Sequence, residues 1–427
     1  MARKMKDSGI EWIGEIPDGW EVVPVRSCFD EVRTKNTDGQ EQNALQFKSG
    51  NIISKANFNA NTDDYVADTI TNYTVVLPDT VMINGLNLNY DFKSLRVALV
   101  KEKGVITSAY LAIFPDRKKI FPQYATYLFK GYETRMAFHN MGAGIRKTLG
   151  YKEFKNQPLL LPSKKEQNKI SAYLDSKCFH IDIMLSKIRS SIEEYKKLKQ
   201  AVITQAVTKG VRSERELKDS GVEWIGEIPK EWAICPLKRL ATIQTGSTPS
   251  KTSSENFYSS NTGTPWIKPD SLGSSFSIEK TTDFLTEEGC SVARILPSNT
   301  VYVGCIGSRI GNCGYSLIPC ACNQQINALI FNGRMYWKYG WYLTIFQEKQ
   351  YMLLANGNVI QIINSTTQGN IPCIVPSITE QKEIAAYLDA KCAEIDELIA
   401  KKEQLEKELE SYKKSLIYEV VTGKREV

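Results

Sequence analysis

A repeat of about half the chain constrains this sequence more than any other feature. Residues 6–20 read KDSGIEWIGEIPDGW and residues 218–232 read KDSGVEWIGEIPKEW, an offset of 212. A second pair follows, PSKKEQNKISAYLDSKCFHID from Pro162 and PSITEQKEIAAYLDAKCAEID from Pro376, at an offset of 214. Because the two offsets nearly agree, one structural unit occurs twice within the 427 residues.

The stretches between the repeated segments differ from each other. Residues 30–155 and 242–372 share almost no residues, although both read as short strands separated by Gly, Asn and Pro turns. A duplicated enzyme would be expected to keep its chemistry in these stretches. Two different fillings on one repeated frame therefore indicate two different specificities.

The segment after each second repeat has the signals of a long helix. Ser163 and Ser377 each precede a glutamate by three residues, which is the pattern of a capping box, and each follows a proline. Gly210 and Gly423 are the expected carboxyl-terminal stops. Each helix should then contain about 45 residues and extend roughly 65 Å at 1.5 Å per residue.

A narrow apolar stripe with alternating steps of three and four residues predicts a coiled-coil seam along both helices. The first stripe, which Lys199 interrupts, consists of Cys178, Ile181, Leu185, Ile188, Ile192, Tyr195 and Val202. The second, with a phase adjustment near Lys402, consists of Leu388, Cys392, Ile395, Ile399, Leu405, Leu409, Tyr412 and Leu416. Such a stripe needs a partner, and the other helix is the obvious one.

Charge favours pairing of the two helices within one chain. Residues 164–212 hold 11 basic and 5 acidic side chains, a net charge of +6, whereas residues 377–427 hold 9 basic and 12 acidic, a net charge of −3. Opposite net charges favour an intramolecular coiled coil of the two helices over self-pairing between chains. The alternative is that both helices present solvated faces with an incidental bias.

Composition places the chain among soluble globular proteins, with 42% hydrophobic and 24% charged residues. The start, MARKMKDSGIEW, lacks the apolar stretch of a secretory signal, and no run approaches eighteen apolar residues. We therefore expect a cytoplasmic protein without membrane association. A net charge of +6 is mild for a nucleic-acid binder, so DNA binding would have to use local basic surface.

The cysteines raise the question of zinc. Cys305, Cys313, Cys320 and Cys322 fall within eighteen residues, but only the last two are close, with one residue between them. Zinc ligands are usually paired two to four residues apart, and these cysteines lie in apolar, strand-like sequence with glycine turns. Buried strand cysteines are therefore favoured, and no metal site is predicted.

Catalytic signatures are missing from the sequence. No phosphate-binding loop and no Asn-Pro-Pro-aromatic motif occur, and Gly142-Ala-Gly144 is a poor dinucleotide fingerprint. Only two histidines are present, so few residues are available for histidine-based acid–base or metal chemistry. The tails of a nuclease pattern at Glu153-Phe-Lys155 and Glu380-Gln-Lys382 are better interpreted as surface or helix-cap charge pairs. We expect no catalytic site and no cofactor on this chain.

The repeated frame with paired helices resembles the specificity subunits of type I restriction–modification systems. EWIGEIPDGW and EWIGEIPKEW resemble the entry to each recognition domain of that family, and the Pro-Ser-x-x-Glu-Gln segments followed by AYLD resemble the start of its spacer helices. In the second filling, Thr245–Ser250, Pro265–Asp270 and Asn323–Ile326 look like recognition-domain motifs, as does Gly104–Tyr110 in the first. The first filling lacks a clear match to the glycine-threonine-proline motif of the second.

The resemblance implies a mixed α/β fold with two target recognition domains held apart by an antiparallel helix pair. It divides the chain into a first recognition domain (1–162), a first spacer helix (163–210), a second recognition domain (211–376) and a second spacer helix (377–427). Each domain would read one half of a split, asymmetric sequence in double-stranded DNA. Two adenine methyltransferase subunits would bind along the helices, with ATP-driven restriction subunits as optional further partners. S-adenosylmethionine, Mg²⁺ and ATP would then belong to those partners.

Amides and guanidinium groups that can reach base edges, and lysines that can hold phosphates, are the candidate DNA-binding residues. In the first filling they are Asn84, Asn87, Asn89, Lys93, Arg96, Arg146 and Lys147. In the second they are Thr245, Ser247, Lys251, Lys268, Ser308, Arg309, Asn323, Gln324, Gln325, Asn358 and Gln361. For any single residue, a turn or a solvated surface remains the alternative. The competing function is a non-catalytic coiled-coil scaffold whose end domains bind proteins.

Overall fold

The computed structural model describes residues 3–48, 50–55, 70–92, 95–142, 144, 147–213, 215–249, 256–273, 281, 283–357 and 360–427. Its contacts divide the chain into two compact units, Met1–Arg189 with Glu403–Val427 and Ser190–Lys402. Both boundaries fall inside long helices, whereas the predicted division treats each helix as a separate segment. The reason is that each globular part shares one hydrophobic core with the helix ends beside it.

The first unit is built on a four-stranded antiparallel sheet with the strand order β4-β11-β8-β9. Its strands are Phe29–Glu31 (β4), Val81–Ile83 (β8), Val97–Leu99 (β9) and Leu111–Pro115 (β11). Two-stranded pairs flank it: Met5–Asp7 with Glu15–Pro17 (β1, β2), Glu21–Pro24 with Pro158–Leu161 (β3, β12), Leu45–Lys48 with Asn51–Ser54 (β5, β6) and Thr74–Val76 with Gly104–Ile106 (β7, β10). The helices are Pro122–Thr134 (α2), Ala137–Met141 (α3), Tyr151–Phe154 (α4) and the start of Lys164–Lys209 (α5).

The second unit has an equivalent four-stranded sheet with the order β16-β23-β20-β21. Its strands are Ala241–Thr245 (β16), Thr300–Gly304 (β20), Cys313–Ser316 (β21) and Ile326–Phe331 (β23). Two strand pairs lie around it: Leu217–Asp219 with Glu227–Pro229 (β13, β14) and Ala233–Pro236 with Pro372–Val375 (β15, β24). A second sheet consists of Tyr258–Ser259 (β17), Phe284–Leu285 (β19), Thr264–Ile267 (β18) and Ala321–Cys322 (β22). The helices are Glu287–Val292 (α6), Trp337–Phe346 (α7), Glu348–Leu354 (α8) and Ser365–Gly369 (α9). The last helix is Ile378–Val421 (α10), of which the part up to Lys402 belongs to this unit and the rest to the first.

The two fillings thus share a sheet topology that their sequences do not show. In each unit the sheet strand that comes first in the sequence, β4 or β16, pairs with the one that comes last, β11 or β23. That last strand also pairs with β8 or β20, which in turn pairs with the edge strand β9 or β21. The second sheet, β17-β19-β18-β22, has no equivalent among the described residues of the first unit. The fold class is the expected one, a mixed α/β unit that occurs twice.

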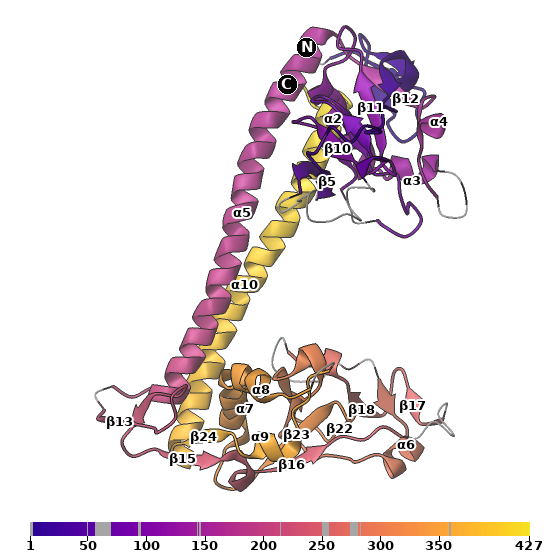
Figure 1. Ribbon diagram of the computed structural model, residues 1–427. Helices are drawn as coiled ribbons and strands as arrows, with labels where there is room; N and C mark the ends of the chain where they lie inside the picture. The colour runs from indigo at the N-terminus through magenta and orange to yellow at the C-terminus, as the bar shows by residue number, and fades with distance from the viewer. Residues whose placement is uncertain are drawn as a thin grey trace. The chain divides into compact units, whose positions relative to one another are not determined.

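A tyrosine-rich helix connects each sheet to the long helices. Tyr127 OH of α2 donates to Asp175 Oδ1 of α5 at 2.8 Å, and Tyr342 OH of α7 donates to Asp389 Oδ1 of α10 at 2.9 Å. Figure 1 shows α7 between α10 and the strands of its unit. Burying a tyrosine hydroxyl without a hydrogen-bond partner costs free energy, so these aspartates favour one face of each long helix for contact with the globular part.

A buried glutamine joins the start of each long helix to the loop before α2 or α7. In the first unit, Gln167 Nε2 donates to the carbonyls of Lys119 and Pro162 at 3.0 and 2.9 Å. Its Oε1 accepts from Phe121 N at 2.8 Å. Gln381 makes the three equivalent contacts in the second unit. Because both side chains are fully buried, every one of these bonds replaces one to water.

The predicted capping boxes are formed in part. Ser163 Oγ accepts from Glu166 N at 3.3 Å, which is the serine half of the box. The Glu166 carboxylate accepts from Trp20 Nε1 at 3.2 Å and pairs with Arg3. The glutamate of the motif therefore fastens the repeated EWIGEIP segment to the helix, a contact that the sequence pattern alone does not reveal.

The second unit repeats this junction. Trp232 Nε1 donates to Glu380 at 2.9 Å, and Glu380 pairs with Arg215. The Arg215 guanidinium lies over the Trp232 ring at 5.7 Å from its centroid. Arg3 and Arg215 are thus equivalent, at the same offset of 212 as the first repeat.

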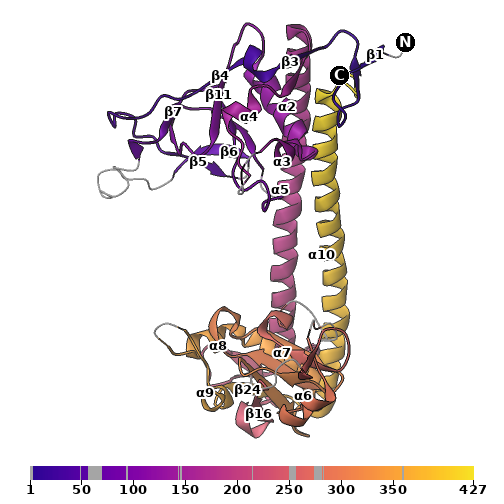
Figure 2. The same cartoon turned by 90° about the vertical axis from the view of Figure 1, so that its right-hand side faces the viewer.

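The two long helices pair in antiparallel fashion in each unit (Figures 1 and 2). Ion pairs connect them, mostly from a basic residue of α5 to an acidic one of α10. They are Lys199–Asp396 (2.7 Å) in the second unit, and Arg189–Glu406 (2.5 Å), Arg189–Glu410 (2.6 Å) and the reversed pair Asp182–Lys413 (2.6 Å) in the first. Arg212, just after the end of α5, pairs with Glu383 of α10 at 2.7 Å. Residue numbers rise along α5 as they fall along α10. The intramolecular coiled coil predicted from opposite charges is confirmed, and Lys199 is paired where it interrupts the seam.

Most of the predicted seam is buried, but two positions are wrong. Cys178, Ile181, Leu185, Ile188, Ile192, Leu388, Cys392, Ile395 and Leu416 are buried, and Tyr195, Val202, Ile399 and Leu409 are half-buried. Leu405 and Tyr412 are 44% and 48% exposed.

The seam of α10 instead passes through charged residues between Ile399 and Leu416. Lys402, Glu406 and Lys413 are half-buried there. Their heads reach partners on α5, since Lys402 lies 5.7 Å from the Tyr195 ring centroid and the other two form ion pairs. Long charged side chains cover apolar surface with their stems while the heads stay paired. The prediction from the sequence favoured Leu405 and Tyr412 because it considered apolar residues alone and ignored the aliphatic stems of charged side chains.

No helix among the described residues is both long and apolar enough to cross a membrane.

Leu416 and Leu405 form a matched pair for testing the corrected seam. Leu416→Ala removes a side chain that is 1% exposed, so the free energy of unfolding of the first unit should fall by about 2–5 kcal/mol. Leu405→Ala should change it by less than about 0.5 kcal/mol, as for other exposed positions. Urea unfolding followed by circular dichroism measures both, and equal losses would contradict the corrected phase.

Candidate nucleic-acid interface

In the second unit, two predicted motifs lie against each other at one end of the sheet. The loop after β16, Thr245–Thr248, packs on the turn between β22 and β23. Gly246 N donates to Ile326 O at 3.0 Å and Ser247 N to Cys322 O at 2.9 Å. A Cβ on Gly246 would lie 2.2 Å from a backbone oxygen, so only glycine permits this approach. Six of the candidate DNA-binding residues lie in the contacting segments or next to them: Thr245, Ser247, Asn323, Gln324, Gln325 and Lys268.

A third loop, which follows β20, adjoins the same turn. Cys305 N donates to Gln325 O at 2.9 Å, and Gly307 N donates to Gln361 O at 2.9 Å. Ser308 and Arg309 are exposed on this loop, and Arg309 lies 3.5 Å from Asp270. The structure therefore brings Ser308, Arg309 and Gln361 to the edge that holds the two motifs. Amide, hydroxyl and guanidinium groups on one exposed edge can donate and accept hydrogen bonds at base edges.

Polar residues that the sequence analysis missed support this edge from below. Asn327 accepts from Thr245 Oγ1 at 2.8 Å and donates to Gln368 Oε1 at 2.7 Å. Both Asn327 and Gln368 are buried. Arg294 donates to Thr245 O at 2.8 Å. The available signal was a polar Asn327 inside the otherwise apolar strand INALIF, directly after the predicted motif.

The first unit forms an equivalent pair of loops. Leu88 N donates to Lys147 O at 3.0 Å and Leu149 N donates to Gly85 O at 2.9 Å. In the second unit the corresponding bonds are Gly307 N to Gln361 O and Ile363 N to Cys305 O, at 2.9 and 3.0 Å. In both units, the loop after the central strand is bonded to the loop before the last short helix. Different side chains are thus presented on one repeated loop frame.

The predicted residues of the first unit that the structure describes share this loop frame, with one exception. Asn84, Asn87, Asn89 and Lys147 are at least partly exposed there. Arg96 is wrong as a base-reading residue, because its side chain is 1% exposed. Its guanidinium donates to the carbonyls of Asn84, Leu86 and Asp91. The sequence could not distinguish an exposed arginine from one around which a loop is folded.

Four predicted residues, Lys93, Arg146, Lys251 and Asn358, lie outside the described residues. The Gly104–Tyr110 motif of the first filling is divided between core and surface. Its first three residues are the buried strand β10, which pairs with β7, whereas Ser108 and Ala109 are exposed and Tyr110 packs 5.5 Å from Phe47. Gly104 is in close contact with the backbone of Asn43. The strand half of this motif therefore contributes to the core of the first unit.

A buried carboxyl lies under the loop frame of the first unit. Glu133 of α2 accepts a hydrogen bond from Arg96 N. Burial raises the pKa of Glu133 to about 7, against the opposing effects of this bond and of Lys130, Arg96 and Lys414. Near neutral pH the carboxyl is thus present in both protonation states, and either state can accept from Arg96 N.

The cysteines are buried thiols of the second core. Cys305, Cys320 and Cys322 are buried and Cys313 is half-buried, all in the reduced form. Burial raises the pKa of Cys305 to about 11 and of Cys322 to about 12. Among the described residues, no group of three or more His, Cys, Asp or Glu is placed to hold a metal ion.

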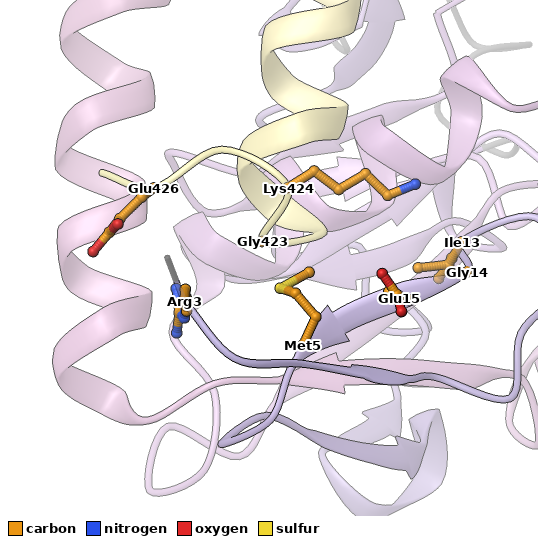
Figure 3. Close-up of a pocket in the computed structure, with 8 residues that line it drawn as sticks. All are labelled: Arg3, Met5, Ile13, Gly14, Glu15, Gly423, Lys424 and Glu426. Atoms are coloured by element: carbon orange, nitrogen blue, oxygen red, sulfur yellow. The ribbon is translucent and has the colours of Figure 1, made fainter. Parts of the chain in front are cut away.

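A hollow of about 510 Å³ lies in the first unit between the β1–β2 pair and the segment after α10 (Figure 3). Arg3, Met5 and Glu15 line one side, and Lys424 and Glu426 come from the other. None of the candidate DNA-binding residues lines it. It belongs to the junction of the repeated EWIGEIP segment with the helix end.

Comparison with known proteins agrees with this architecture. Residues 229–410 match the family model described as type I restriction modification DNA specificity domain. Two curated relatives from Methanocaldococcus jannaschii are each 24% identical to the chain. The putative type I restriction enzyme MjaX specificity subunit is matched over 96% of this chain and 95% of its own length, and the type I restriction enzyme MjaVIII specificity subunit over 96% and 93%.

A solved structure has the same fold. It is described as "Structural basis underlying complex assembly and conformational transition of the type I R-M system", and it superposes with a TM-score of 0.72 at 15% identity, covering 96% of this chain and 99% of that one. In its family match, its nearly full-length relatives and its repeated fold, this chain is similar to the specificity subunits of type I restriction–modification systems.

Proposed function

We propose that this chain reads a bipartite, asymmetric target in double-stranded DNA, with one unit for each half. The observation that carries this proposal is the repeated loop frame. The same two backbone bonds join equivalent loops in both units, while the side chains on them differ, with Asn87 and Lys147 in the first and Arg309 and Gln361 in the second. One frame with two sets of donors and acceptors fits two different half-sites.

The chemistry of each loop frame fits DNA better than it fits a protein partner. Direct reading of base pairs uses amide and guanidinium side chains, and these gather with hydroxyl groups on the second unit's edge. Within the described part of the chain, the polar partner of the Arg309 guanidinium is Asp270 at a long 3.5 Å, so its fork can be redirected to a guanine edge. A coiled-coil scaffold that binds proteins is the competing function, and it would not need polar, unlike edges on a common frame.

The paired helices are proposed to set the distance between half-sites and to bind two methyltransferase subunits, with restriction subunits as optional further partners. Catalysis would belong to these partners, together with S-adenosylmethionine, ATP and Mg²⁺. The chain itself would contribute recognition and spacing and no catalytic group.

Co-expression with a type I methyltransferase subunit from the same organism, followed by genome-wide mapping of modified adenines, tests the proposal. The modified sites should share two unlike half-sites separated by a fixed gap, and they should vanish without this chain. A continuous motif, or methylation that is independent of this chain, would favour the scaffold.

Arg309→Ala tests direct reading in the second unit. Losing a bidentate contact should weaken binding of the methyltransferase complex to its cognate duplex by about 1–3 kcal/mol and relax one position of one half-site. Arg239→Ala is the control, because Arg239 is an exposed arginine at the opposite end of β16. Equal losses on cognate and random duplexes would argue against base reading by Arg309.

Paired deletions test the spacing role of the helices. Residues 186–192 and 403–409 face each other in the register set by the Asp182–Lys413 and Lys199–Asp396 pairs. Removing both heptads should keep the seam and shorten the pair by roughly 10 Å. The gap should shrink by about three base pairs with both half-sites unchanged, and duplication of both heptads should widen it. An unaltered gap in the methylated sites of both variants would exclude a spacing role.

A further inference from the structure

The loop that follows β8 in the first unit exposes aromatic side chains. Tyr90 is 73% exposed and Phe92 is 58% exposed, and they lie in the same loop as Asn84, Asn87 and Asn89. The equivalent loop of the second unit, Cys305–Asn312, contains no aromatic residue and presents Arg309. The two loops therefore offer different chemistry from the same place in the frame.

The loop is held in one conformation by a buried guanidinium. Arg96 donates to Asn84 O at 2.9 Å and Leu86 O at 2.8 Å, and also to Asp91 O. Among side chains, only the planar guanidinium offers enough donors in a fixed fork to bind several carbonyls at once. The loop is consequently wrapped around the Arg96 side chain.

Further contacts fix the position of Tyr90 itself. Asn87 adopts the left-handed conformation with φ of 53°, and its carbonyl accepts from Tyr90 N at 3.1 Å and Asp91 N at 3.0 Å. His139 Nε2 donates to Asp91 O at 3.1 Å, and its ring stacks on Phe92 with centroids 5.1 Å apart. Tyr90 thus stands on a rigid turn with its ring in solvent.

We propose, on the basis of the proposed function, that Tyr90 is a DNA-contacting, specificity-determining residue of the first half-site and that Arg96 is its positioning residue. The loop is continuous with the amides of the candidate interface and is bonded to Lys147, whose charge suits a phosphate backbone. In the major groove the apolar group at a base edge is the thymine methyl, so the Tyr90 ring contacts a thymine. The first half-site is then read by apolar contact where the second is read by a guanidinium.

The test uses the complex of this chain with its methyltransferase subunits and the duplex defined by methylome mapping of the wild type. Tyr90→Ala should weaken binding to this duplex by about 5- to 150-fold, the range for the loss of one base contact in a duplex. Preference should relax at one position of the first half-site and stay intact in the second. Leu77→Ala, at the opposite end of β8 and 48% exposed, should change neither.

Uracil at each thymine of the first half-site in turn removes one methyl group. At one position the wild type should lose about fourfold in affinity, and Tyr90→Ala should lose nothing there. In Arg96→Lys, the base preference should relax at the same position of the first half-site, and amide hydrogen exchange in residues 84–92 should become faster. Recognition of the second half-site should be unaffected.

Unchanged affinity and base preference in Tyr90→Ala would overturn the proposal, as would uracil substitutions to which the wild type is indifferent. Loss of co-purification with the methyltransferase, with base preference intact, would overturn it in favour of a protein-docking loop. Because the wild-type methylome is determined first, the absence of a bipartite motif would refute the proposed function itself.

Discussion

The buried amides of Gln167 and Gln381 are the constraint on which each unit depends. Each one makes two bonds from the first turn of a long helix to the loop that leads into α2 or α7 and a third to the proline before the helix, at 2.7–3.1 Å. The glutamate beside each amide holds Trp20 or Trp232, so the repeated EWIGEIP segment is attached to the same turn. A fully buried polar junction has little freedom to reorient, because any displaced bond would remain unsatisfied. The globular part and the helix end therefore behave as one body.

Ion pairs select the register and the antiparallel orientation of the two long helices. A purely apolar seam would tolerate slippage and self-association, whereas Arg189 with Glu406 and Glu410, and Lys199 with Asp396, match only in one register. Such pairs contribute little stability at partly exposed sites. Their value lies in selecting the antiparallel partner within the chain. The fillings carried by this frame are then free to diverge, as Arg309 and Tyr90 on equivalent loops illustrate.

The sequence predicted the features that rest on local rules. Ser163, Gly210 and the heptad steps defined the first long helix, and net charge predicted its partner. The shared sheet topology could not be predicted, because its strands are short and the two fillings have diverged. Arg96 was misassigned because the role of a guanidinium depends on whether a loop folds around it. Leu405 and Tyr412 were misassigned because charged stems can take seam positions. The base-reading roles of the exposed candidates remain predictions.

An exchange of fillings tests most directly whether each unit reads its own half-site. Val25 N bonds to Gln157 O and Leu237 N bonds to Ile371 O, both at 3.0 Å, so these pairs mark equivalent borders of the two fillings. In the test variant, a second copy of residues 25–157 stands in place of residues 237–371, so that both units contain the first filling. This variant should keep both junctions and the helix pair. In complex with the methyltransferase it should modify sites whose two halves are identical, each equal to one half of the native target. Modified sites that retain two different halves would contradict the account.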